Sequence, residues 1–296
     1  MSMTIDAFLE SAWSDHADNP REVADRVAAS LHVVQSPEHV PPFVRLLVHV
    51  YGEHLGEWQR GVELLASLRQ SAAVDSSTQA LGSIVRGVAT LRYASGSSEG
   101  LNALSPEDQV VALATASSAL AAREEIPRAI TAFAEAVRAA QAGLPSASLA
   151  HRALAVGGNN LATTLEEKRN RTPSETEAMV AAAEAGLKYW KRAGTWLEEE
   201  RAEYRLARSL LQARRPSAAL QSAKRCLAVC EHNTAPPFEE FFAHAVVALA
   251  HRAGGDEGSF EAHRRMARSV FEQLPEAERK SCEGDLAELD GRNGLP

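Results

Sequence analysis

Apolar side chains recur every three or four residues along this chain, which is the spacing that places them on one face of an α-helix. Residues 201–231 show the pattern in two blocks that meet at Arg214-Arg215-Pro216. The apolar positions are Leu206, Ala207, Leu210 and Leu211 in the first block, then Ala219, Leu220, Ala223, Cys226 and Leu227 in the second. Proline suits the first turn of a helix, where its missing N–H is not needed. This stretch therefore predicts a hairpin of two helices.

The same pattern predicts helices over nearly the whole chain, separated by short breaks that contain Pro or Gly. Runs of β-branched residues bounded by turns are absent from the sequence, so we expect no strand. The expected helices cover residues 4–16, 20–35, 43–54, 58–70, 78–94, 106–123, 127–142, 146–168, 174–193, 196–213, 216–231, 238–253, 256–273 and 275–289.

One place in this series lacks a helix. The Gly-containing loop 95–100 is followed by residues 101–104, which are long enough for one turn only. We expect this segment to be the first that a protease cleaves, because its glycines raise the entropy that ordering must overcome. We expect the chain to form a single domain over 1–290, closed by a capping helix, with a flexible tail at 291–296.

Small and large apolar residues follow one spacing in several of these hairpins. In residues 111–140 the pattern is Ala116, Ser117 and Leu120, followed by Ala129, Phe133 and Ala136, and residues 201–231 repeat it. Looser copies place Val48, Gly52, Gly61, Leu65 and Leu68 in 43–70, and Asn160, Leu161, Ala162, Leu165, Ala178, Ala182 and Ala185 in 156–187. This arrangement resembles the tetratricopeptide repeat (TPR) over most of the chain, although no single repeat is complete.

The resemblance implies a fold and a class of function. The fold would be all-α: a right-handed α-α superhelix, or TPR-like solenoid, of about six helical hairpins plus the C-terminal capping helix. In that family, successive first helices line a concave groove that binds a protein or peptide. The matching positions in this chain are Asn159, Thr163, Glu166, Arg201, Tyr204, Arg208 and His244.

Composition narrows the remaining classes. The chain has 296 residues and a formal net charge of −8, which argues against general binding of nucleic acid. Three cysteines do not suggest a disulfide framework. No basic segment leads into an apolar run at the start, and no apolar stretch is long enough to cross a membrane. We therefore expect a cytoplasmic protein that binds neither nucleic acid nor membrane.

Three groups of residues offer metal-ligand chemistry, and each has a simpler interpretation. His49, Glu53 and His54 miss a zinc-protease spacing by one residue, and histidines five apart on an α-helix point about 140° away from each other. His244 and His251 are seven apart, too far for one ion without a third ligand, and Cys226 with Cys230 fits packing. We expect no metal and no cofactor.

Charge is concentrated in residues 188–225. This stretch has ten basic and four acidic residues, whereas residues 1–150 have ten basic and 17 acidic ones. Four aromatic residues lie in the same stretch: Tyr189, Trp190, Trp196 and Tyr204. Arginine and aromatic side chains dominate many interfaces. The alternative is a solvated charged face in which nearby glutamates pair with the arginines at i, i+4.

Within that stretch, Arg201, Tyr204 and Arg208 share one face of the expected helix. A guanidinium can hold a carboxylate through two parallel hydrogen bonds, so we expect this face to bind an acidic or C-terminal carboxylate group of a partner. If the arginines are exposed, replacing both should leave stability nearly unchanged. Asn159 follows Gly157-Gly158, where the glycines either allow close helix contact or free the asparagine for a ligand.

Taken together, the sequence predicts a non-enzymatic interaction scaffold. Nothing in it resembles a P-loop, a dinucleotide fingerprint, a nucleophile elbow or an EF-hand loop. Two alternatives stay open. One is a sensor or enzyme that binds a small anionic metabolite in region 188–225, and the other is a module that associates with itself as a homodimer.

Overall fold

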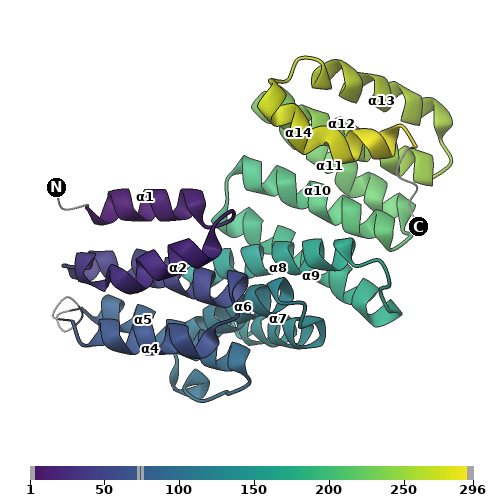
Figure 1. Ribbon diagram of the computed structural model, residues 1–296. Helices are drawn as coiled ribbons and strands as arrows, with labels where there is room; N and C mark the ends of the chain where they lie inside the picture. The colour runs from purple at the N-terminus through teal and green to yellow at the C-terminus, as the bar shows by residue number, and fades with distance from the viewer. Residues whose placement is uncertain (1–3, 72–73, 75–76, 292–296) are drawn as a thin grey trace. The chain divides into compact units, whose positions relative to one another are not determined.

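The computed structural model describes residues 4–71, 74 and 77–291, and these form helices and turns without a strand (Figure 1). The all-α prediction is confirmed. No helix in the described part of the chain is long and apolar enough to span a lipid bilayer. By the density of contacts, the chain divides into two compact units, Met1–Gly157 and Gly158–Pro296.

The first unit is a series of short and medium helices. They are α1 (Ile5–Asp15), α2 (Pro20–Ala29), α3 (Val40–His49), α4 (Trp58–Arg69), α5 (Thr78–Ser95), α6 (Pro106–Ala122) and α7 (Ile126–Ala140). Shorter turns separate some of them: the 3₁₀ turns Leu31–Val33, Pro37–His39 and Leu101–Ala103, and the π-helical turn η3 (Val50–His54). The single turn predicted at 101–104 is confirmed, whereas the helix expected over 20–35 already ends at Ala29.

Helix α8 (Leu149–Glu167) contains the boundary between the two units, and the second unit continues with six more helices. These are α9 (Pro173–Ala193), α10 (Trp196–Gln212), α11 (Pro216–Asn233), α12 (Pro237–Ala253), α13 (Glu257–Phe271) and α14 (Glu276–Leu289). A single domain over 1–290 stays a prediction. Of the expected tail, residues 292–296 lie outside the described residues.

Consecutive helices pack as hairpins within each unit, which confirms the TPR-like pairing. Helix α4 packs on α5 and α6 on α7 in the first unit, and α10 packs on α11 and α12 on α13 in the second. Small residues make this contact close. Ala116, Ala129 and Ala136 are fully buried between α6 and α7, and the Ser117 hydroxyl donates to the Ala129 carbonyl at 2.9 Å.

Local sequence signals explain where many of these helices begin. Proline occupies the first turn of α2, α6, α7, α9, α11 and α12. In α9 the hydroxyl of Thr172 accepts from the Glu175 N–H while the Glu175 carboxylate accepts from the Thr172 N–H, and Thr195 with Glu198 does the same at α10. Such reciprocal caps satisfy N–H groups that have no partner inside the helix.

The paired glycines in α8 allow close contact between helices. A Cβ atom on Gly158 would lie 2.6 Å from the Ala182 carbonyl oxygen and 2.8 Å from the Gly186 nitrogen, both in the backbone of α9. One on Gly157 would lie 3.0 Å from the carbonyl oxygen of Ala114 in α6. The close-contact interpretation of these glycines is therefore confirmed.

Candidate functional site

Helix α10 carries the three predicted groove residues that lie together. Its apolar face includes Leu206 and Leu210, which are buried, and this fixes which way the opposite face points. Arg201, Tyr204 and Arg208 lie on that opposite face and meet acidic side chains of α12 and α14. The second unit thus builds a carboxylate-binding surface, which we call the α10 acid site: Arg201, Tyr204, Arg208, Glu239, Asp285 and Glu288.

At one end of the α10 acid site, helix α14 supplies two carboxylates. The Tyr204 hydroxyl donates to Asp285 Oδ1 at 2.5 Å, and Arg208 Nη1 donates to Glu288 Oε2 at 2.7 Å. Arg208 Nη1 also lies 3.5 Å from Asp285 Oδ1. Only 17% of the Arg208 side chain is exposed, so this is a largely buried ion pair and not a solvated one.

At the other end, Arg201 binds Glu239 of α12. Its Nε and Nη2 atoms donate to the two carboxylate oxygens, which is the two-bond geometry expected from the sequence. The Glu239 side chain is 6% exposed, whereas that of Arg201 is 55% exposed. The guanidinium therefore holds a buried acid of its own chain and still reaches solvent.

Aromatic packing positions the hydroxyl of Tyr204. Its ring meets Phe242 edge-to-face with centroids 5.5 Å apart, and Phe242 makes the same kind of contact with Phe238 and Phe241. Burial, together with the charge of Asp285, raises the pKa of Tyr204 well above its ordinary value. Although burial opposes it, the neighbouring Tyr204 and the two carboxylates raise the pKa of Arg208. At neutral pH, Tyr204 therefore donates a proton and Arg208 stays cationic.

The predicted groove residues of α8 lie in the same unit but serve α8 and its contact with α10. Glu166 accepts from Arg205 and, at 2.6 Å, from the Ser209 hydroxyl. Burial raises the pKa of Glu166, against the effect of Arg205. The Thr163 hydroxyl donates to the Asn159 carbonyl at 2.9 Å within α8, and both residues are partly exposed.

His244, the last predicted groove residue, faces α13. Its Nδ1 atom lies 3.1 Å from Nδ1 of His263, and burial lowers its pKa. The seven predicted residues therefore separate into three places: the α10 acid site, the contact of α8 with α10, and the contact of α12 with α13. Their part in binding a partner stays a prediction.

A cleft of about 590 Å³ lies in the aromatic and basic region, between α9, α10 and α11. The indoles of Trp190 and Trp196 line it. Its cations Lys191 and Arg225 both bind the buried Glu203, at 3.2 Å and 2.9 Å. Glutamates here pair between helices and not at i, i+4 as the charged-face alternative assumed. An anion entering this cleft would have to compete with Glu203.

The two cysteines of α11 are packing residues, as the sequence indicated. Cys226 and Cys230 are free thiols and fully buried. The Cys226 thiol donates to Glu200 Oε1 at 3.0 Å. Burial, with a further contribution from Glu239, raises the pKa of Glu200 to about 7.

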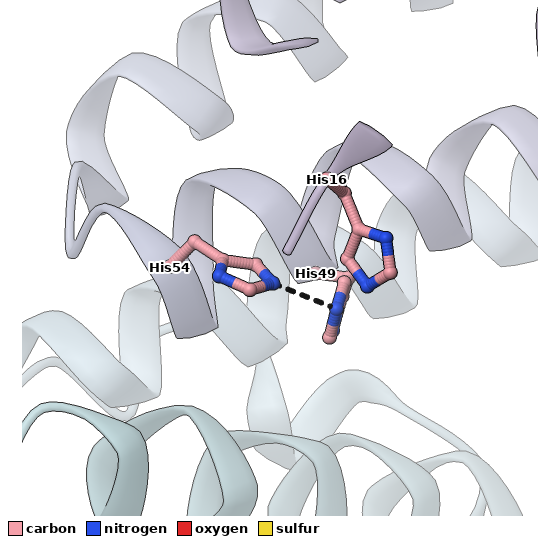
Figure 2. A group of neighbouring side chains, drawn as sticks. All are labelled: His16, His49 and His54. Carbon is pink, nitrogen blue, oxygen red and sulfur yellow. Dashed lines mark hydrogen bonds between the residues drawn. The ribbon is translucent and has the colours of Figure 1, made fainter. Parts of the chain in front are cut away.

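Three histidines in the first unit gather at one point, and here the geometric expectation is wrong. Residues 50–54 form a π-helical turn and not an α-helix. In such a turn, residues five apart lie one above the other, so His49 and His54 face each other with Nε2 atoms 3.2 Å apart. His16, just after α1, joins them (Figure 2). Burial, with lesser effects of His49 and His16, lowers the pKa of His54.

Sequence reasoning missed the partners of the residues that it selected. Asp285 and Glu288 lie about 80 residues beyond Tyr204 and Arg208, and no local pattern links them. A signal existed in the spacing of Asp285 and Glu288, which are three apart and so share a face of α14. His16 carried no such signal, because it comes from a different helix.

Comparison with known proteins adds two similar solved structures. No protein-family model and no curated protein matches this sequence. The first structure comes from Podosopora anserina and is described as a kinesin light chain with nearly identical TPR-like repeats; it is 14% identical, covers 76% of this chain and 91% of its own, and has a TM-score of 0.49. The second is BtubC from P. vanneervenii, with 16% identity, 83% and 90% coverage, and a TM-score of 0.48.

Proposed function

We propose that this chain is a non-enzymatic interaction scaffold that binds an acidic segment of a partner protein at the α10 acid site. One observation carries the proposal: Tyr204 and Arg208 already hold two carboxylates that are three residues apart on a helix. A partner helix with acidic residues at the same spacing, or a C-terminal carboxylate, offers the same chemistry to the same donors.

The donors on α10 suit a carboxylate better than other ligands. Arg208 is planar and permanently charged, and Tyr204 adds a neutral O–H donor beside it. Charge-assisted hydrogen bonds of this kind are stronger than neutral ones. Two such bonds on one helix face also fix the register of the bound segment, which gives specificity as well as attraction.

In this proposal α14 is a built-in occupant that the partner replaces. Helix α14 lies against α12 and α13, where Cys282 and Leu289 are buried. Its position over α12 can be followed in Figure 1. Because α14 belongs to the same chain, it competes at a high effective concentration. A partner segment must therefore bind more tightly than α14 or bind when α14 is released.

A labelled peptide copying residues 275–291 tests the proposal by fluorescence anisotropy. The receptor is the full chain carrying Asp285→Asn and Glu288→Gln, which keeps the shape of α14 but removes its charges. We expect this variant to bind the peptide at least tenfold more tightly than the wild-type chain, where α14 competes. A control peptide with Asn and Gln at the same two positions should bind neither receptor well.

Equal affinity for the acidic and neutral peptides would overturn the proposal, as would absence of binding to the folded variant. Circular dichroism verifies the fold of the receptor. Using the matched peptides avoids any change in Arg208, whose removal also affects stability. Light scattering over a range of chain concentrations tests the homodimer alternative, since exchange of α14 between two copies would raise the mass.

A further inference from the structure

Three imidazole rings converge in the first unit, from separate parts of the chain (Figure 2). His49 ends α3, His54 ends the π-helical turn η3, and His16 follows α1. One ring nitrogen from each lies within 4.8 Å of the other two. All three side chains are partly buried. Among the described residues this is the one group of three or more such side chains close enough to share an ion.

The π-helical turn is what makes the convergence possible. Its bonds run from the Leu55 N–H to the Val50 carbonyl at 3.1 Å and from the Glu57 N–H to the Tyr51 carbonyl at 2.8 Å. The Tyr51 hydroxyl anchors the turn to the Ala24 carbonyl at 2.8 Å. Turns of this kind are rare and occur frequently at functional sites.

Hydrogen bonds at the outer nitrogens decide where the lone pairs point. His16 Nδ1 lies 2.7 Å from the Trp13 carbonyl oxygen, so it must be the N–H donor. His49 Nδ1 lies 3.0 Å from Glu53 Oε2 and is a donor for the same reason. In a neutral imidazole the other nitrogen then carries a lone pair. Nε2 of His16 and Nε2 of His49 are therefore both available as ligands.

We propose that His16, His49 and His54 form a binding site for a divalent transition-metal ion, with zinc as the best-fitting ion. Imidazole suits zinc, and zinc–nitrogen bonds measure about 2.0–2.1 Å, which puts two ligands of a tetrahedral ion roughly 3.3 Å apart. The Nε2 atoms of His49 and His54 already lie 3.2 Å apart. His54 binds through Nε2 once its proton is on Nδ1, and a water molecule takes the fourth position.

The surroundings match those of metal-binding histidines. Such histidines nearly always donate their second nitrogen to a carboxylate or a backbone carbonyl, which fixes the ring and makes it a better ligand. Glu53 and the Trp13 carbonyl have these positions here. The Trp13 ring packs against His16 and His49, with centroids 5.0 Å and 5.1 Å away. The ion would join α1 to the end of α3.

Packing of aromatic rings is the competing explanation for the cluster. A second pair of histidines provides a control for it: His244 and His263 place their Nδ1 atoms 3.1 Å apart, but they have no third ligand in range. If close histidines in this chain bind zinc merely by proximity, both places should bind it. If the three-ligand geometry is needed, only the first should.

The test uses the full chain, without an affinity tag, stripped of metal by a chelator. Zinc is titrated in competition with a chromophoric chelator, and cobalt is titrated with its visible absorption as a direct signal of tetrahedral ligation. We expect one zinc per chain. His49→Ala or His54→Ala should abolish stoichiometric binding, and Glu53→Gln should weaken it by about 10- to 100-fold because it removes the orienting carboxylate. His244→Ala should leave binding unchanged.

The outcomes separate the two explanations. Absence of zinc binding to the folded wild-type chain overturns the proposal, and so does full binding by the variant that lacks all three histidines. Loss of binding in His244→Ala also overturns it. Should an alanine variant fail to fold by circular dichroism, Glu53→Gln and the cobalt spectrum of the wild-type chain still decide the question.

Discussion

Replacing Glu200 by Gln should stabilise the second unit, and the gain should depend on pH. The Glu200 side chain is 1% exposed on α10, and its Oε1 accepts from the Cys226 thiol. Its Oε2 has no hydrogen-bond partner, and the carboxylate of Glu239 is a neighbour. Glutamine keeps the size and the acceptor atom but carries no charge into this buried position.

The size of the effect follows from the pKa. Burial raises the pKa of Glu200 from 4.5 to about 7. Below pH 4.5 the group is protonated in both the folded and the unfolded chain, so it costs nothing. As the pH rises towards 7, the unfolded chain loses its proton more readily, and the folded state loses stability. One pKa unit corresponds to about 1.4 kcal/mol, so the full loss is on the order of 3 kcal/mol.

Urea unfolding of both chains at a series of pH values measures this. The difference in free energy of unfolding, variant minus wild type, should grow by roughly 3 kcal/mol between pH 4.5 and pH 8. Other titrating groups are common to both chains and largely cancel. A difference that stays flat with pH would refute the reasoning, and so would a variant that is less stable than the wild type at pH 8.

Three further predictions concern packing and order. Arg208→Ala should lower the free energy of unfolding by about 3–5 kcal/mol in urea titrations, because the mostly buried guanidinium leaves two α14 carboxylates unpaired, contrary to the neutral effect expected for an exposed arginine. Gly158→Ala should lower the melting temperature, at a cost of about 1–3 kcal/mol, because the new Cβ would meet the Ala182 carbonyl at 2.6 Å, whereas Gly82→Ala has open space and should stabilise by about 0.5–1 kcal/mol. Limited proteolysis followed by mass spectrometry should find the first cut within residues 96–100.

Much of the fold was predictable because its signals are local. Periodic apolar residues, Pro in first turns and small residues between helices each act within one or two turns of chain. The hairpin of 201–231 shows this: α10 and α11 lie where the pattern places them. The end of the second helix was not predictable in this way, since Ser30 and the 3₁₀ turn that follows it break a pattern that continues to Val34.

The candidate sites depend on contacts that no local pattern encodes. The face shared by Arg201, Tyr204 and Arg208 follows from helical spacing, but its occupant Glu288 comes from 80 residues away. The histidine cluster depends on a π-helical turn, and the α-helical angle used to reject it did not apply. That turn packs closely, as Gly52 shows: a Cβ there would touch Leu91, Ala119 and Trp58 side chains. Tertiary packing therefore decided both sites.

The boundary inside α8 has a consequence for local opening of the backbone. One continuous helix from Leu149 to Glu167 contributes residues to two separately packed units. Amide protons within one helix usually exchange with solvent as a group, but cooperative opening follows tertiary packing. Amides before Gly157 should therefore report the stability of the first unit, and those after Gly158 that of the second. A single helix would then show two rates of hydrogen exchange.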